Sequence, residues 1–175
     1  MNVNKDLLQA RKIYLSNNID SAMADSIGED LLLLNARDES LPIFLYINSG
    51  GGLYQSSMDI YDYVLNSHAP VVGIVYSKAD SMASIILQAC KKRQIMRNSS
   101  ICLHNLSVWV DTEWDKFEEL ARERIALTMK RQNLIYEIFT ERTGLRKEEI
   151  VDICNKKTIF SAEEALKNNL VDEII

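Results

Sequence analysis

The sequence predicts one α/β domain over residues 1–175, in which strands alternate with helices. Two continuous apolar runs, Ile43–Ile47 and Val71–Tyr76, are typical of strands that are covered on both faces. Apolar residues at helical spacing lie between them, from Met58 to Leu65, so the three segments form a predicted βαβ unit. A chain of 175 residues is long enough for one well-packed core but short for two domains.

The segments on either side continue this alternation. Ile13–Leu15 is a β-prone run, and Asp20 behind it can N-cap a helix whose apolar residues recur at helical spacing. Short strands are expected at Ile95–Met96 and Ile101–Leu103, around a turn at Asn98–Ser100.

A long amphipathic helix is predicted after these strands, from about Glu113 to Thr143. Thr112 and Asp115 resemble a capping box at its start, and Gly144 is a plausible stop. The remaining sequence predicts a helical turn at 150–153, a strand at 158–160 and a last short helix behind a capping box of Ser161 and Glu164.

Charge and cysteine content exclude several classes of protein. The net charge is −5 without a stripe of Lys or Arg, which argues against nucleic acid and anionic membrane surfaces as partners. The start lacks the basic and apolar regions of a signal peptide, and no apolar run is long enough to span a membrane, so we expect a cytoplasmic protein. Cys90, Cys102 and Cys154 show no CxxC spacing, and we expect reduced thiols, no metal and no cofactor.

Three predicted strand ends carry residues suited to chemistry, and ligands gather at such ends in open α/β sheets. The glycine run Gly50–Gly52 can expose backbone N–H groups to an oxyanion, although a plain tight turn explains it equally well. Ser81 stands between a strand and a helix that begins at Met82, where a serine is more often an N-cap than a nucleophile. His104 ends an apolar strand and is a better candidate base than His68, although a structural role is common there.

Taken together, four separated segments resemble a known family. Tyr46–Gly52 (YINSGGG), Met58–Asp62, Ala79–Ser84 (ADSMAS) and Leu103–Asn105 are similar, in order and spacing, to the proteolytic subunit of the Clp protease. The tail from Phe160 to Asp172 agrees as well, so the resemblance runs from about residue 13 to the end.

The resemblance implies a ClpP/crotonase-like spiral of βαβ units with a protruding handle helix, in a handle region of about 108–150. It implies a serine endopeptidase in which Ser81 is the nucleophile, His104 is the general base, and the backbone N–H groups of Gly52 and Met82 form the oxyanion hole. It also implies seven-membered rings that stack as a tetradecamer and degrade unfolded polypeptides inside a chamber.

The sequence departs from the family pattern at three places. Lys157 stands where the family has the triad aspartate, so we expect a dyad, a substitute such as Asp152 or Asn155, or an inactive subunit. Asp80 replaces a small residue before the nucleophile, where a carboxylate disfavours a nearby oxyanion unless it points to solvent. Most of the family's N-terminal axial loop is missing from this sequence, so an AAA+ unfoldase partner is not favoured.

Two alternative functions remain open at this point. Lys157 favours a ClpR-like subunit that fills ring positions without catalysis. A crotonase-like acyl-CoA enzyme also uses a backbone oxyanion hole on a related fold, but the pair of Ser81 and His104 argues against it. The sequence does not indicate the cleavage preference or whether the rings are homomeric.

Overall fold

The computed structural model describes residues 3–175, with side chains from residue 6 onward. In chain order its elements are α1 (Val3–Gln9), β1 (Lys12–Ile19), α2 (Ser21–Arg37), β2 (Ile43–Gly52), α3 (Tyr54–Leu65), β3 (Val71–Asp80), α4 (Met82–Ala89), β4 (Lys92–Ile95), β5 (Ser100–Leu103), a 3-10 turn (Trp114–Lys116), α5 (Phe117–Thr143), α6 (Lys147–Asn155), β6 (Thr158–Ser161), α7 (Ala162–Lys167) and β7 (Glu173–Ile174).

The strands form a mostly parallel sheet with the order β1-β2-β3-β4-β7, and β5 and β6 branch from it. All pairs are parallel except that of β5 with β6. Strands β1 to β3 are linked by α2 and α3, which gives the repeated βαβ connection that the apolar runs predict. The predicted α/β fold with a mainly parallel sheet is therefore confirmed.

Strand β3 has two different neighbours along one edge. Its first half, Val72–Val75, pairs with β4, and its last residues, Lys78–Asp80, pair with β5. The two short strands after α4 therefore both pair with β3 and not with each other. This branch brings the end of β5, and His104 behind it, beside the end of β3.

Helix α4 is the most buried helix of the fold. All eight of its residues are buried, as expected for a helix that is apolar on every side. It contacts β2, β3, α3 and α5, so its first turn is fixed by packing on several sides. The packing of α4 therefore also fixes the position of Ser81, the residue that precedes it.

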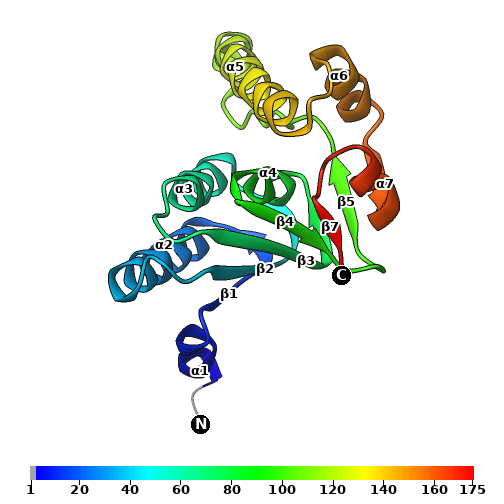
Figure 1. Cartoon of the computed structure of the whole chain (residues 1–175). Helices are drawn as coiled ribbons and strands as arrows, with labels where there is room; N and C mark the ends of the chain where they lie inside the picture. The colour runs from blue at the N-terminus through cyan, green and yellow to red at the C-terminus, as the bar shows by residue number, and fades with distance from the viewer. Residues whose placement is uncertain (1–2) are drawn as a thin grey trace.

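Helix α5 projects away from this core. Figure 1 shows α5 and α6 beyond α4, at the opposite end of the molecule from α1. The buried residues of α5 all lie in its last third, from Ile135 to Thr143, while its first half is largely exposed. Gly144 ends the helix at φ 75°, and its N–H donates to Thr140 O at 3.0 Å, as the sequence predicts.

The N-termini of the helices show which of the predicted caps form. Asp20 accepts from the N–H of Met23, and Ser161 forms a reciprocal box with Glu164, so both predictions are confirmed. The box of Thr112 and Asp115 is wrong: a 3-10 turn occupies 114–116, and α5 begins at Phe117 without a side-chain cap. Helix α1 and strand β7 were not predicted, because each is short and lacks a strong apolar period.

The buried apolar residues form a cluster that draws on the sheet and on α2 to α7. The extent of the domain, residues 1–175, stays a prediction.

Candidate active site

Ser81 lies at the sharp junction between β3 and α4, with φ 54° and ψ −127°. This region of φ and ψ is that of the first central residue of a type II′ turn, which glycine dominates. A serine held there is strained, and strained strand-to-helix turns present nucleophiles in several hydrolase folds. Hydrogen bonds fix the backbone, from Ser81 N–H to Cys102 O at 2.9 Å and from Ser84 N–H to Ser81 O at 3.0 Å.

The side chain of Ser81 does not serve as a helix cap. Ser81 occupies the N-cap position of α4, but its hydroxyl accepts no hydrogen bond from the first turn. Instead the hydroxyl of Ser84 bonds to the carbonyl of Ser81 at 2.6 Å. The capping role that the residue type favours is therefore not found, and the half-buried Ser81 hydroxyl is left available.

The glycine run packs directly against this junction. A Cβ on Gly51, which has φ 93°, would lie 2.8 Å from Ser81 Cβ and 3.0 Å from the nitrogen of Met82. The end of β2 can approach the nucleophile this closely only because position 51 has no side chain. The alternative of a plain tight turn does not account for this contact, since Gly51 belongs to a strand that continues to Gly52.

The two predicted oxyanion donors, the N–H groups of Gly52 and Met82, directly follow Gly51 and Ser81 in the sequence. Met82 opens α4, so its N–H has no partner within the helix. Leu53 N–H donates to Ile19 O in β1 at 2.8 Å, and N–H groups alternate across a strand, so Gly52 N–H is directed away from β1. A Cβ on Gly52 would lie 2.2 Å from Ile19 O, which excludes a side chain there as well.

His104 reaches the same edge of the sheet from β5. Asp80 pairs with Cys102 in parallel register, so Ser81 and His104 follow adjacent strands at their carboxyl ends. His104 Nδ1 lies 2.7 Å from Asn105 O. A carbonyl only accepts, so Nδ1 carries the proton and Nε2 carries the lone pair of a base. Within residues 3–175 no hydrogen bond joins the Ser81 hydroxyl to His104.

The loop that orients His104 is held by two helices. The Tyr136 hydroxyl of α5 donates to Asn105 Oδ1 at 2.7 Å, and Asn105 Nδ2 donates to Asn155 Oδ1 of α6 at 2.7 Å. Asn155 therefore acts on the loop and not on the imidazole. The other suggested substitute, Asp152, is exposed and pairs with Lys156 at 2.6 Å.

Lys157 directly precedes β6, whose first residue, Thr158, pairs with Leu103 of β5. Lys157 has φ 50°, and its N–H donates to Cys154 O at 3.1 Å, so it belongs to the turn between α6 and β6 and not to the ladder. Its side chain is exposed. No hydrogen bond or ion pair joins Lys157 to His104 within the described residues, although the sequence resemblance expects an acid at position 157.

Asp80, the residue before the nucleophile, carries the negative charge of this region. Burial, the largest effect, raises the pKa of its carboxyl above the ordinary value of 3.8. The charges of Lys78, His104 and Lys157 and the N–H of Cys102 oppose that rise. Lys78 Nζ lies 3.8 Å from the carboxylate, so Asp80 does not simply point to solvent.

An open cavity adjoins the glycine run. It has a volume of about 490 Å³ and is lined by Asn17, Asn18, Asn48, Gly50, Gly51 and Lys78. Gly51, where a side chain would collide with Ser81, is one of its lining residues, but Ser81 itself does not line it.

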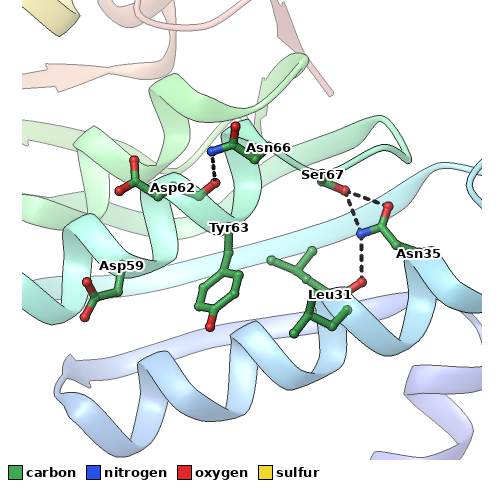
Figure 2. A pocket seen from close by; sticks show the side chains of 8 residues that line it. Leu31, Asn35, Asp59, Asp62, Tyr63, Asn66 and Ser67 are labelled. Atoms are coloured by element: carbon green, nitrogen blue, oxygen red, sulfur yellow. Dashed lines mark hydrogen bonds between the residues drawn. The ribbon is translucent and has the colours of Figure 1, made fainter.

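A second cavity lies between α2 and α3, away from these residues (Figure 2). It has a volume of about 420 Å³ and is lined by Leu31, Leu32, Asn35, Asp59, Asp62, Tyr63, Asn66 and Ser67. Its amide is already used, since Asn35 bonds to Ser67 and to Leu31 O. No residue of β3, β5 or α4 lines it, and it holds no pair of nucleophile and base.

The described part of the chain offers neither a metal site nor a membrane-spanning helix. Residues 3–175 contain no group of three or more His, Cys, Asp or Glu that could hold a metal ion. Cys90, Cys102 and Cys154 are free and buried. Among the described helices, none has the length and apolar character needed to cross a membrane.

Comparison with known proteins gives a consistent result. The model of the Clp protease family matches residues 1–175. The chain is 33% identical over 171 residues to the ATP-dependent Clp protease proteolytic subunit of Deinococcus radiodurans, covering 97% of this chain and 82% of that one. It is 36% identical over 171 residues to proteolytic subunit 2 of Tropheryma whipplei, covering 96% and 92%, and 32% identical to that of Frankia casuarinae, covering 97% and 77%.

The match over the whole chain and identities above 30% over nearly the whole chain lead to one conclusion. The chain belongs to the Clp protease family.

Proposed function

We propose that this chain is a serine endopeptidase subunit in which Ser81 attacks the peptide bond and His104 is the general base. The observation that carries the proposal is the uncapped, strained Ser81 at a strand-to-helix junction, with the end of β5 beside it. A serine whose only task was to start a helix would bond to the first turn and would not need a positive φ. Membership in a protease family supports the same assignment.

The proposed reaction follows from these positions. Ser81 Oγ attacks the carbonyl carbon of the substrate while its proton passes to Nε2 of His104. The carbonyl oxygen becomes negative and accepts hydrogen bonds from the N–H groups of Gly52 and Met82. When the C–N bond breaks, Nε2 returns the proton to the leaving amine. Water then repeats the sequence, which releases the acid and restores the Ser81 hydroxyl.

The orientation of His104 has a different source from that of an ordinary triad. Asn105 O fixes the tautomer that a triad aspartate would fix, but a carbonyl is neutral and stabilises the imidazolium less. Replacing the triad aspartate by its amide in a comparable protease lowers kcat about 10⁴-fold. We therefore expect slow turnover compared with a complete triad.

The proposed assembly is a ring of seven chains, stacked as a tetradecamer in the cytoplasm, that encloses the sites and admits unfolded polypeptide. It is supported by the part of α5 before its buried residues, where large apolar side chains are exposed: Phe117, Ile125, Leu127, Met129 and Leu134. Trp109 and Trp114, just before this helix, are 85% and 89% exposed. Single chains in water do not favour so much exposed aromatic surface, and a second ring would cover it.

A second candidate is a subunit that completes a ring without catalysis. Lys157 favours it, because an ammonium group at the position of the family's triad aspartate cannot stabilise the positive charge that the base must carry. The comparisons match proteolytic subunits and give the acyl-CoA alternative no support.

Covalent labelling with a fluorophosphonate probe tests the proposal. The assembled protein should take up one label per chain, and Ser81→Ala should take up none. Ser107→Ala is the matched control, because Ser107 is an exposed serine three residues after His104. His104→Ala should label at least about 100-fold more slowly, as expected for loss of a general base. An intact ring that takes up no label would favour the non-catalytic subunit.

A further inference from the structure

The open cavity beside the glycine run is lined by polar groups whose hydrogen-bonding capacity is unused. Its side chains are three amides and one ammonium group: Asn17, Asn18, Asn48 and Lys78. From residue 6 onward, no hydrogen bond involves any of these four side chains. The remaining lining residues, Gly50 and Gly51, have no side chain to fill the space. A ligand in the cavity therefore meets free donors instead of groups that already have partners.

The cavity lies where the ladders of three parallel strands become irregular. The pairing of β1 with β2 shifts register between Ser16 and Asn18, and that of β2 with β3 shifts between Ile47 and Ser49. Asn17 stands within the first shift, with φ 69°. Irregularities of this kind redirect side chains and are over-represented beside active sites. The amides and the ammonium group therefore come from three different strands that are held together by pairing.

Lys78 gives the cavity a positive charge. It is the one charged residue among those that line the cavity within the described chain. Its Nζ lies 3.8 Å from Asp80 Oδ2, which is beyond hydrogen-bonding distance, so this pair leaves the ammonium donors free. A Cβ on Gly50 would lie 3.7 Å from Nζ, so the ammonium also faces the glycine run. The cavity is consequently suited to a negative group and repels a cation.

A carboxylate is the negative group that these donors match. A carboxylate only accepts hydrogen bonds, and both an ammonium group and the NH₂ of an asparagine amide can donate to its oxygens. The cavity is also close to the proposed nucleophile, because a Cβ on Gly51, one of its lining residues, would lie 2.8 Å from Ser81 Cβ. Consecutive residues of an extended peptide are about 3.4 Å apart. A polypeptide at Ser81 can therefore place the carboxylate of a nearby residue in the cavity.

We infer that this cavity is a carboxylate-binding subsite of the proposed peptidase. Lys78 pairs with an acidic side chain or the C-terminal carboxylate of the substrate, and the asparagine amides donate hydrogen bonds to it. The inference rests on the proposed function and adds a substrate class, acidic polypeptide segments and chain ends. Asp80 weakens this preference, because its carboxylate competes with that of the substrate for the same ammonium group.

Cleavage of matched peptides by the assembled protein tests the subsite. The two peptides of a pair differ only in Glu or Gln at one position, and that position is moved along both sides of the scissile bond. At one position wild type should favour Glu by about three- to fivefold in kcat/KM, mainly through KM, as expected for an ion pair that water partly screens. Lys78→Met should remove this preference. Asp80→Asn should increase it, because the competing carboxylate is lost.

The control is Lys167→Met, which removes the same charge from an exposed position on α7 and should leave the preference unchanged. An equal loss for the Glu and Gln peptides in Lys78→Met would show that Lys78 only supports the bend, and that result would overturn the inference. Arg131, whose guanidinium lies 4.6 Å from the ring of Tyr54, is another cation near the glycine run in sequence and fold. Loss of the preference in Arg131→Met and not in Lys78→Met would also overturn it.

The C-terminus of the peptide separates the two sources of the carboxylate. A peptide without Asp or Glu is compared with the same peptide carrying a C-terminal amide. An advantage of the free C-terminus that depends on Lys78 would assign the subsite to chain ends. An advantage of Glu over Gln in amidated peptides would assign it to acidic side chains. No advantage in either comparison would reject the subsite.

Binding to Ser81→Ala protein separates this inference from the proposed hydrolysis. In fluorescence anisotropy the Glu peptide should bind with a Kd about three- to fivefold lower than the Gln peptide, and adding Lys78→Met should remove the difference. This difference in a protein whose wild type cleaves no peptide would reject the peptidase and keep the binding site. Cleavage by wild type without a Glu preference at any position would reject the subsite alone.

Discussion

Two charged regions of the sheet are built in opposite ways. Arg93 of β4 is 5% exposed and binds Asp172 through its side chain and through its backbone N–H, the latter at 2.7 Å, and it also bonds to Gln88 at 2.6 Å. At the end of β3, by contrast, the hydroxyl of Ser81 and Nε2 of His104 make no hydrogen bond to another described residue. In the first region each guanidinium nitrogen of Arg93 donates a hydrogen bond, and the second leaves reactive atoms free on a strained backbone.

This difference indicates where stability and function reside. The buried Arg93 and the half-buried Asp172 tie the C-terminal segment before β7 to β4 and to the end of α5. The free Ser81 hydroxyl, the free Nε2 of His104 and the unfavourable φ of Ser81 do not stabilise the fold. Such a backbone persists only where the surrounding packing imposes it. The variants below test that contrast.

The largest effect on stability is expected at the pair of Arg93 and Asp172. Asp172→Asn should lower the free energy of unfolding by about 2 kcal/mol, because it leaves the buried Arg93 charge uncompensated, while water screens part of the interaction at the 38% exposed Asp172. Asp152→Asn is the control: its ion pair with Lys156 is exposed at both ends and is worth at most about 0.5 kcal/mol. Urea unfolding of both variants measures the difference, and equal losses would contradict the contrast.

The same pair should make stability depend on acid. Burial alone would raise the pKa of Asp172, but the hydrogen bonds and charge of Arg93 outweigh it and hold the pKa below the ordinary 3.8. A carboxyl whose pKa is lower in the folded protein stabilises the fold at pH values above its ordinary pKa. This stabilisation is lost as the pH falls through the lowered pKa. The difference in the free energy of unfolding between wild type and Asp172→Asn should therefore become smaller below pH 3.8.

The next effect is expected at the glycine run. In Gly51→Ala the added Cβ would meet Ser81 Cβ at 2.8 Å in a backbone of φ 93°, so the bend and the nucleophile must separate. We expect labelling to slow about 100-fold, as for loss of one oxyanion donor. Gly50→Ala is the matched control, since its Cβ would meet only Lys78 Nζ, at 3.7 Å. Comparable losses in both variants would show that the bend does not position Ser81.

The smallest effect is expected from the strain at position 81. Ser81→Gly should be more stable than Ser81→Ala by about 1 kcal/mol, because glycine adopts φ 54° without steric cost. Both variants lack the hydroxyl, so neither should label, and only the backbone differs between them. Thermal unfolding of the two proteins measures the difference. A less stable glycine variant would show that this turn carries no strain.

Local signals predicted much of the fold. The buried strands β2 and β3, the cap at Asp20, the box at Ser161 and the stop at Gly144 depend on neighbouring residues, and the structure has them. The start of α5 that Thr112 and Asp115 predict is wrong, because a 3-10 turn with Glu113 at its N-cap position precedes the helix. Nothing in the sequence separates these two outcomes, which depend on how the chain leaves the loop after β5.

By itself the sequence determined which residue types stand at which strand ends: glycines after β2, a serine after β3 and a histidine after β5. Only the tertiary structure decided what each is free to do. The uncapped Ser81 hydroxyl is seen only in the folded chain, and the position of Ser81 beside the end of β5 depends on the β3–β5 register. The physical reason is that strand pairing joins segments more than twenty residues apart in the sequence. A shift of that register by one residue would turn every side chain of the strand to the other face of the sheet.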